Sequence, residues 1–283
     1  PWVGPVSDAL QAWPSLDEAR AALRDGTGRG IKIAVLDSGV EFGHPALAGL
    51  KVTDDLAVMD DGLQLRVVPG EGSDAYGHGT AVAGIIQQLA PEATIGSFRV
   101  LGSHLRSRTM IIREAARLAL ERGYHILICS FGCGREDHVL LYKDWIDEAY
   151  LQGRHIVAAC NNQDFTKREW PGHFPSVITV NFTRCDASEE FHYRQGQLVE
   201  FAAHGQDVDV PWLGGERKQV TGSSFAAPHV TGLLALLLER YRFTRSDLDV
   251  ALGQTARHHG AFRDFNQGYG FIDGVMLAQY FEQ

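Results

Sequence analysis

The chain has 283 residues, 45% of them hydrophobic and 22% charged, which is enough to bury the core of an ordinary folded domain. Its net charge of −9, without any cluster of lysine or arginine, excludes nucleic acid as an expected partner. No apolar run approaches the roughly 18 residues of a membrane span, and no linker or repeat divides the sequence. We therefore expect one domain over residues 1–283 and no membrane contact.

The first predicted strand covers residues 31–36 and ends in Asp37-Ser38-Gly39. A carboxylate at the carboxyl end of a strand is well placed for a catalytic site, although a turn-capping aspartate explains this motif alone equally well. An aspartic protease would need a second copy of the motif, and the chain has one. A dinucleotide-binding fold would place its glycines after the strand, whereas Gly26, Gly28 and Gly30 precede it.

Residues 52–72 are acidic and irregular, and they include Asp54, Asp55, Asp60 and Asp61. We expect an exposed hairpin or loop here. An ion site is the less favoured alternative.

The first predicted helix covers residues 81–89 and follows Gly77-His78-Gly79-Thr80. A histidine between two glycines leaves room for another backbone or a ligand to approach closely. Taken alone, His78 fits a structural role as well as a catalytic one. A metal site is not favoured, because no second ligand follows His78 at the helical spacing of four residues.

Strands and helices then alternate along the chain. Apolar runs predict strands at 94–100, 124–130, 155–159 and 177–180, and three- and four-residue spacings of apolar residues predict helices at 110–122 and 144–151. Apolar strands separated by helices are typical of an α/β fold with a mostly parallel central sheet and helices on both faces.

A long helix is predicted after the segment Gly222-Ser223-Ser224-Phe225-Ala226-Ala227-Pro228-His229. A serine at a helix N-terminus exposes its Oγ, and its backbone N–H faces any oxyanion that forms there. Pro228 is tolerated near a helix start, where a missing N–H costs little. A serine that only caps the helix is the alternative for this motif.

Together the three motifs resemble the subtilase family, which carries Asp-Thr/Ser-Gly, Gly-His-Gly-Thr and Gly-Thr-Ser-Met-Ala-x-Pro-His in this order. The resemblance implies a subtilisin-like fold. It also implies that Ser224 is the nucleophile, His78 its general base and Asp37 the group that orients His78.

Other segments extend the resemblance to most of the chain except residues 1–25 and 52–72, and include the closing segment 268–272. Residues 157–162 resemble the family's Ala-Ala-x-Gly-Asn, which implies Asn162 as the oxyanion donor, with Asn161 as the less favoured choice. Two further segments resemble the edges of the substrate site, and they imply substrate binding by Ser130, Phe131 and Gly132 and by Gly102, Ser103 and His104.

Several residues depart from the family pattern. Cys133 and Cys160 replace small residues beside the S1 pocket, so we expect large aromatic P1 side chains to be disfavoured unless both thiols face the core. The family's calcium-binding loop after the catalytic histidine has no counterpart, since residues 87–91 run straight on. We therefore expect no cofactor, no bound metal and no high-affinity calcium site of the usual kind.

Four cysteines, Cys129, Cys133, Cys160 and Cys185, are too few for a disulfide scaffold, so we expect reduced thiols, with one disulfide as the alternative. The first twenty residues show no signal-peptide pattern. The compartment stays unknown. These features favour the cytoplasm weakly, and secretion after processing is the alternative.

The sequence therefore predicts a serine endopeptidase that hydrolyses peptide bonds through an acyl-enzyme, either broadly or as a processing protease for one precursor peptide. The expected partners are a protein or peptide substrate and a propeptide or inhibitor in the cleft. Two alternatives stay open. One is a peptide ligase or macrocyclase on the same fold, and the other is a catalytically inactive pseudoprotease that acts as a binding module.

Overall fold

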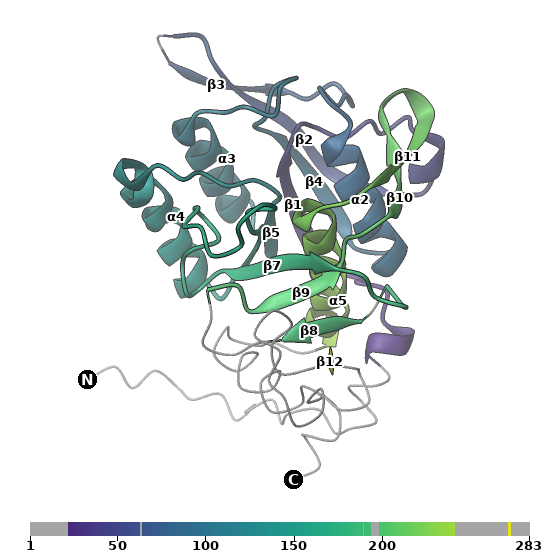
Figure 1. The fold of residues 1–283 in the computed structure, drawn as a ribbon. Coiled ribbons are helices and arrows are strands. Elements are labelled where there is room, and N and C mark those ends of the chain that lie inside the picture. The colour runs from purple at the N-terminus through teal and green to yellow at the C-terminus, as the bar shows by residue number, and fades with distance from the viewer. Residues whose placement is uncertain (1–21, 63, 189, 194–197, 241–270, 273–283) are drawn as a thin grey trace, which may run out of the picture.

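The computed structural model shows one large sheet covered by helices on both faces (Figure 1). The strand order is β12-β8-β9-β7-β6-β5-β1-β4-β2-β3, and β10 and β11 form a separate two-stranded sheet. The residues that the structure describes are 22–62, 64–188, 190–193, 198–240 and 271–272. The predicted single domain over residues 1–283 includes residues outside these ranges. The predicted closing segment 268–272 also lies mostly outside them, since only residues 271–272 of it are described.

The centre of the sheet is parallel, as the sequence predicts. Its strands are β4 (Thr94–Arg99), β1 (Lys32–Asp37), β5 (Ile126–Cys129), β6 (His155–Ala159) and β7 (Ile178–Thr183), and each pairs in parallel with the next. Most residues of these strands are buried, and most of the buried ones are apolar, because helices cover both faces of the sheet.

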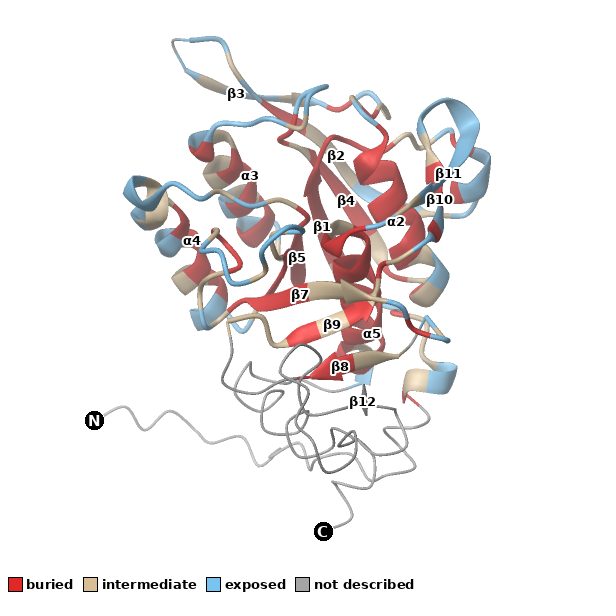
Figure 2. Cartoon of the chain, in the orientation of Figure 1, coloured by how far each residue is buried: buried red, intermediate tan, exposed pale blue. Residues whose placement is uncertain are grey.

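Helices α2 (His78–Leu89) and α5 (Ser223–Arg240) cover one face, and α3 (Thr109–Glu121) and α4 (Val139–Leu151) cover the other. Strand β1 shows the division. Ile33 and Val35 pack with α2 and α5, whereas Ala34 and Leu36 pack with α3 and α4. Figure 2 shows that the strands at the centre of the sheet are largely buried. The predicted α/β architecture is confirmed.

Residues 52–72 form a hairpin of β2 (Lys51–Asp60) and β3 (Leu65–Pro69), but β2 also pairs in parallel with β4 and extends the main sheet. The acidic residues explain how. Asp54 accepts a hydrogen bond of 2.6 Å from the Tyr124 hydroxyl and also contacts Arg122. Asp55 Oδ2 accepts from the backbone N–H of Gly72 at 2.6 Å. Asp54 thus fixes the hairpin to the segment between α3 and β5, whereas the bond of Asp55 lies within residues 52–72.

The remaining elements complete the edges. β8 (Phe191–Tyr193) pairs with β9 (Phe201–His204) and with β12 (Phe271–Ile272), both antiparallel. The β10–β11 hairpin packs on α2 through Val208 and Val210. No helix in the described ranges is long and apolar enough to cross a membrane. The strands of this hairpin are β10 (Val208–Trp212) and β11 (Glu216–Val220). Short 3-10 helices cover Pro45–Leu47, Glu136–His138 and Leu213–Gly215.

Candidate active site

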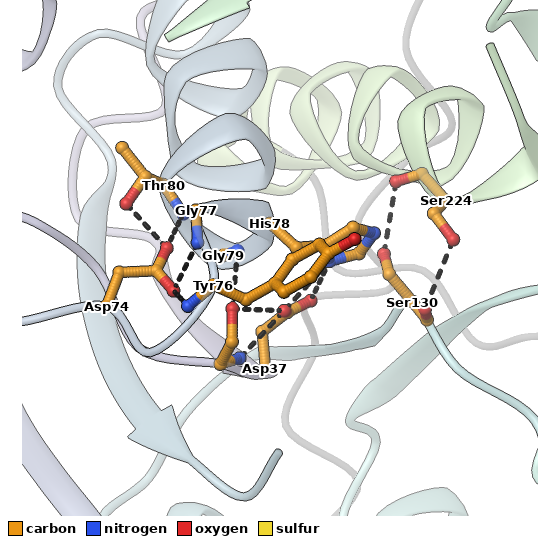
Figure 3. A network of polar contacts seen from close by, with 10 residues as sticks. Asp37, Asp74, Tyr76, Gly77, His78, Gly79, Thr80, Ser130 and Ser224 are labelled. Atoms are coloured by element: carbon orange, nitrogen blue, oxygen red, sulfur yellow. Dashed lines mark hydrogen bonds and ion pairs between the residues drawn. The ribbon is translucent and has the colours of Figure 1, made fainter. Parts of the chain in front are cut away.

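Asp37 and His78 meet where β1 ends and α2 begins (Figure 3). His78 Nδ1 lies 2.8 Å from Asp37 Oδ1 and 2.9 Å from Oδ2, and both side chains are buried. Asp37 Oδ1 also accepts from the backbone N–H of Ser38 at 2.7 Å. The carboxylate is therefore fixed at the strand end, and it in turn fixes one nitrogen of the imidazole.

Gly79 allows the helix to start against the end of β1. A Cβ at this position would lie 2.0 Å from the carbonyl oxygen of Gly39 and 3.1 Å from the Cβ of Asp37, so no other residue fits without a backbone shift. Its N–H donates to Ser38 Oγ at 3.1 Å. A glycine is therefore required after His78, because the backbone of α2 approaches the backbone of Gly39 closely at this point.

The N-terminus of α2 is capped by Asp74, a residue that the sequence analysis did not identify. Asp74 Oδ1 accepts from the N–H groups of Tyr76 and Gly77 at 2.9 and 2.8 Å. Oδ2 accepts from the N–H and hydroxyl of Thr80 at 2.8 and 2.6 Å. The only signal in the sequence was an aspartate shortly before a helix start, which is common at helix caps and is not specific.

The electrostatics of His78 follow from this arrangement. Burial lowers its pKa, but the charge and hydrogen bond of Asp37, together with the charge of Asp74, outweigh burial and hold that pKa above the ordinary 6.5. Two buried carboxylates therefore stabilise the imidazolium form of His78.

Two serines begin α5, and the structure distinguishes them. Ser223 is fully buried, and its hydroxyl contacts the carbonyl oxygen of Cys160 at 2.6 Å and Asn162 Oδ1 at 2.8 Å. Ser224 is half-buried. The ring of His78 lies 5.3 Å from that of Phe225, the residue after Ser224, which places the imidazole beside the start of α5.

Ser224 is joined to Ser130 by a reciprocal pair of hydrogen bonds (Figure 3). Ser224 Oγ donates to the carbonyl oxygen of Ser130 at 3.2 Å, and Ser130 Oγ donates to the carbonyl oxygen of Ser224, also at 3.2 Å. Among the described residues, no hydrogen bond joins Ser224 to His78. In this conformation the serine hydroxyl is therefore directed to Ser130.

Pro228 explains why the carbonyl of Ser224 is open to Ser130. In a regular α-helix the N–H of residue 228 would donate to the carbonyl four residues earlier, which is that of Ser224. Proline has no N–H, so this carbonyl lacks its regular donor within α5. The Ser130 hydroxyl takes its place and connects the start of α5 to the segment after β5.

The two candidate oxyanion asparagines differ in what their side chains do. Asn161 is fully engaged: its Nδ2 donates to Glu169 at 2.9 Å, and its Oδ1 accepts from the N–H groups of Gln163 and Asp164, both at 2.9 Å. Asn162 is exposed, and its Oδ1 accepts from the N–H of Ser223 at 2.8 Å. Its Nδ2 makes no hydrogen bond with any described residue, so this donor is available.

The predicted substrate-binding residues occupy the carboxyl ends of β4 and β5, the neighbours of β1. Ser130 is buried, Phe131 is half-buried and Gly132 is exposed. Gly102, Ser103 and His104 are exposed in a loop after β4, which is closed by the bond from Gly102 N–H to the carbonyl oxygen of Arg106 at 3.1 Å. Ser130 contacts Ser224, whereas no hydrogen bond joins residues 102–104 to Asp37, His78 or Ser224 within the described chain.

All four cysteines are free thiols. Cys133 packs against the cluster that contains Trp145 and Trp170, so its side chain faces the core. The thiol of Cys160 lies 3.3 Å from Asn181 Oδ1, and burial raises the pKa of this thiol to about 12. These contacts weaken the reason for expecting that the cysteines narrow the S1 pocket.

Comparison with known proteins agrees with the geometry. A family model described as "Subtilase family" matches residues 28–270. Thermitase from Thermoactinomyces vulgaris is 28% identical over 262 residues, which cover 89% of this chain and 90% of that protein. Subtilisin BL from Lederbergia lenta is 29% identical over 225 residues, covering 76% and 78%. A solved structure of a cold adapted subtilisin-like serine proteinase matches with a TM-score of 0.70 and 25% identity, covering 88% of this chain and 89% of that one.

The match to the family model includes all the elements that carry the site, from β1 to α5. The relatives are peptidases that align over most of their own length. The chain belongs to the subtilase family and is a serine peptidase, a hydrolase of peptide bonds.

Proposed function

We propose that Asp37, His78 and Ser224 form the catalytic triad of this peptidase. The observation that carries the proposal is the buried contact of His78 Nδ1 with both carboxylate oxygens of Asp37, beside the helix start that bears Ser224. A neutral serine is a weak nucleophile near neutral pH and needs an adjacent base. His78 is the base that lies beside it.

The nucleophile is activated by a change of rotamer. A rotation of about 120° about χ1 takes Ser224 Oγ away from the Ser130 carbonyl and towards the free Nε2 of His78. His78 then accepts the hydroxyl proton as Oγ attacks the peptide carbonyl, and it later returns that proton to the leaving amine. Asp37 holds the imidazole in the required tautomer and stabilises the imidazolium that forms.

The oxyanion is stabilised by two donors in this proposal. One is Asn162 Nδ2, whose amide is oriented by the bonds from Ser223 to its oxygen. The other is the N–H of Ser224, one of the first N–H groups of α5, which lack partners within the helix. Both donors act mainly on the charge that develops in the transition state.

The test is a pair of serine variants read out with a fluorophosphonate probe and a peptide substrate. Ser224→Ala should lose both probe labelling and hydrolysis, while its circular dichroism spectrum stays that of the folded protein. Ser223→Ala should still be labelled, because Ser223 only supports Cys160 and Asn162. Labelling of Ser224→Ala would contradict the assignment, and a wild type that is never labelled would indicate the pseudoprotease.

Hydrolysis and ligation are distinguished by the product. Capture of the acyl-enzyme by water adds the mass of one water to the products, whereas capture by a peptide amine adds none. We propose water as the acceptor, so mass spectrometry of the products should show that addition. A cyclic or joined product without it would favour the ligase.

We also propose that the enzyme is a processing protease, with a single precursor peptide as its substrate and a propeptide or inhibitor able to occupy the same site. Cleavage of a peptide library should then give a narrow consensus over several positions. Broad cleavage at many unrelated sequences would indicate a digestive protease instead.

A further inference from the structure

Glu169 is a carboxylate that the mechanism does not use, and it lies beside the reacting residues. Its side chain is only 16% exposed. The next residue, Trp170, forms a two-way backbone bridge with Cys133, in which each N–H donates to the other carbonyl oxygen at 2.9 Å. This bridge fixes Glu169 next to the segment 130–133.

The two carboxylate oxygens of Glu169 have different surroundings. Oε1 accepts from Asn161 Nδ2 at 2.9 Å and lies 3.5 Å from the Lys167 ammonium, whose side chain is 57% exposed. Oε2 lies over Gly132, where an added Cβ would be only 2.6 Å away. Oε2 has no hydrogen bond with any described residue. The negative charge is thus sheltered, and one of its oxygens is open.

The position of this charge relative to Ser224 follows from the contacts of the start of α5. One segment that Glu169 touches, 130–133, is bonded to Ser224 through Ser130. The other, 160–162, is bonded to Ser223 through Cys160 and Asn162. The Glu169 carboxylate therefore lies between the two segments that flank the nucleophile.

A substrate whose carbonyl reaches Ser224 places the side chain of that same residue, P1, between these two segments. A sheltered carboxylate with an open oxygen favours a cation and disfavours apolar or acidic groups, because its charge is otherwise left uncompensated. Lys167 lies 3.5 Å from Oε1, but its side chain is 57% exposed, so solvent screens its charge and it compensates the carboxylate only in part. A guanidinium or ammonium group from the substrate would complete that compensation.

We infer that Glu169 is a specificity-determining residue that selects arginine or lysine at P1. This inference rests on the proposed function, since it places the P1 side chain relative to Ser224. In this proposal the charge of Glu169, and not the bulk of the cysteine side chains, determines which P1 side chain is preferred. Gly132 is also part of this specificity site, because any side chain at that position would displace the Glu169 carboxylate.

The experiment compares kcat/KM for peptides that differ only at P1, with Arg, Lys, Leu, Phe or Glu. The wild type should prefer Arg and Lys to Leu by at least about 10-fold. Glu169→Gln keeps an oxygen for Asn161 but removes the charge, and it should lower kcat/KM for P1 Arg by about 10- to 100-fold. Its kcat/KM for P1 Leu should change by less than about 3-fold, and Glu169→Lys should shift the preference towards P1 Glu.

Asp147→Asn is the matched control, because it removes the same charge from an exposed position on α4. It should leave the P1 preference unchanged. Fluorophosphonate labelling, which needs no P1 side chain, shows whether the site of each variant is intact. A wild type that prefers Leu or Phe, or a Glu169→Gln variant with an unchanged Arg-to-Leu ratio, would overturn the inference. A wild type without labelling or hydrolysis for any P1 would overturn the proposed function instead.

Discussion

With His78 as the proposed base, we expect its protonation to set the lower pH limit of activity. The base must be neutral to accept the proton of Ser224, so activity is lost as pH falls through the pKa of His78. Asp37 and Asp74 hold that pKa above 6.5 despite burial. We expect the acid limb of kcat/KM against pH to have its midpoint above 6.5, and this midpoint should move to lower pH in Asp74→Asn, which removes one stabilising charge.

The measurement is a pH profile of kcat/KM for both proteins with one peptide substrate. Thr80→Val provides a control, because it removes a hydrogen bond to Asp74 and leaves the charge in place. A midpoint that moves upward in Asp74→Asn would contradict the assignment of His78 as the base.

Asn162 and Asn161 should differ in their effect on the chemical step. Asn162→Ala removes the proposed oxyanion donor, and kcat should fall by about 10²–10³-fold with little change in KM. Asn161→Ala loses a turn and a contact with Glu169, so its kcat with a P1 Leu substrate should change much less. Steady-state kinetics on both variants decides the matter, and equal losses in kcat would argue against Asn162.

Among single residues, those that lie in a short characteristic sequence motif could be predicted from the sequence. Asp37, His78 and Ser224 stand in such motifs, and the structure brings Asp37 and His78 into contact. Asp74 and Glu169 could not be identified, because their roles depend on backbone groups and segments that are distant in the chain. No local pattern distinguishes Ser224 from Ser223 as the nucleophile, whereas the full burial of Ser223 in the folded protein does.

Among the elements, the start of α5 depends on a hydroxyl from another segment. The Ser224 carbonyl lacks its regular donor within the helix because of Pro228, and the Ser130 hydroxyl supplies one. Ser130→Ala should therefore lower the free energy of unfolding by about 1 kcal/mol, since it leaves a partly buried acceptor without its donor. In the background of Pro228→Ala the same change should cost less, because the introduced alanine supplies a helical N–H.

A double-mutant cycle measured by urea denaturation tests this coupling. The cycle cancels the separate effect of proline on the unfolded chain. If Ser130→Ala costs the same free energy in both backgrounds, the hydroxyl does not replace the missing N–H.

The predictability of the elements follows from their burial. Residues 33–36 and 156–159 are buried on both faces of the sheet and are apolar without interruption, which is why the sequence indicated the strands at 31–36 and 155–159. Strand β11 is almost wholly exposed, and β2 is acidic, so neither shows such a run. Their strand character comes from pairing with β10 and β4, which no local pattern reveals.

For the whole molecule, we predict that thermal stability does not depend on calcium. Helix α2 continues without interruption from His78 to Leu89, so the loop that would bind the ion in the family has no place in it. Asp54 and Asp60 form ion pairs within the protein, which leaves them less suited to an ion. The melting temperature measured with and without a chelator should agree within a few degrees, and a larger drop would point to a metal site.

The order of the parts along the chain has a consequence for biosynthesis. Asp37 lies on the first central strand, but Ser224 is on α5, whose apolar residues fill the core only after β7 and β9 have been made. A growing polypeptide therefore carries Asp37 and His78 long before it carries Ser224 in its folded position. In a refolding experiment the return of activity should therefore report the docking of α5 on the central sheet.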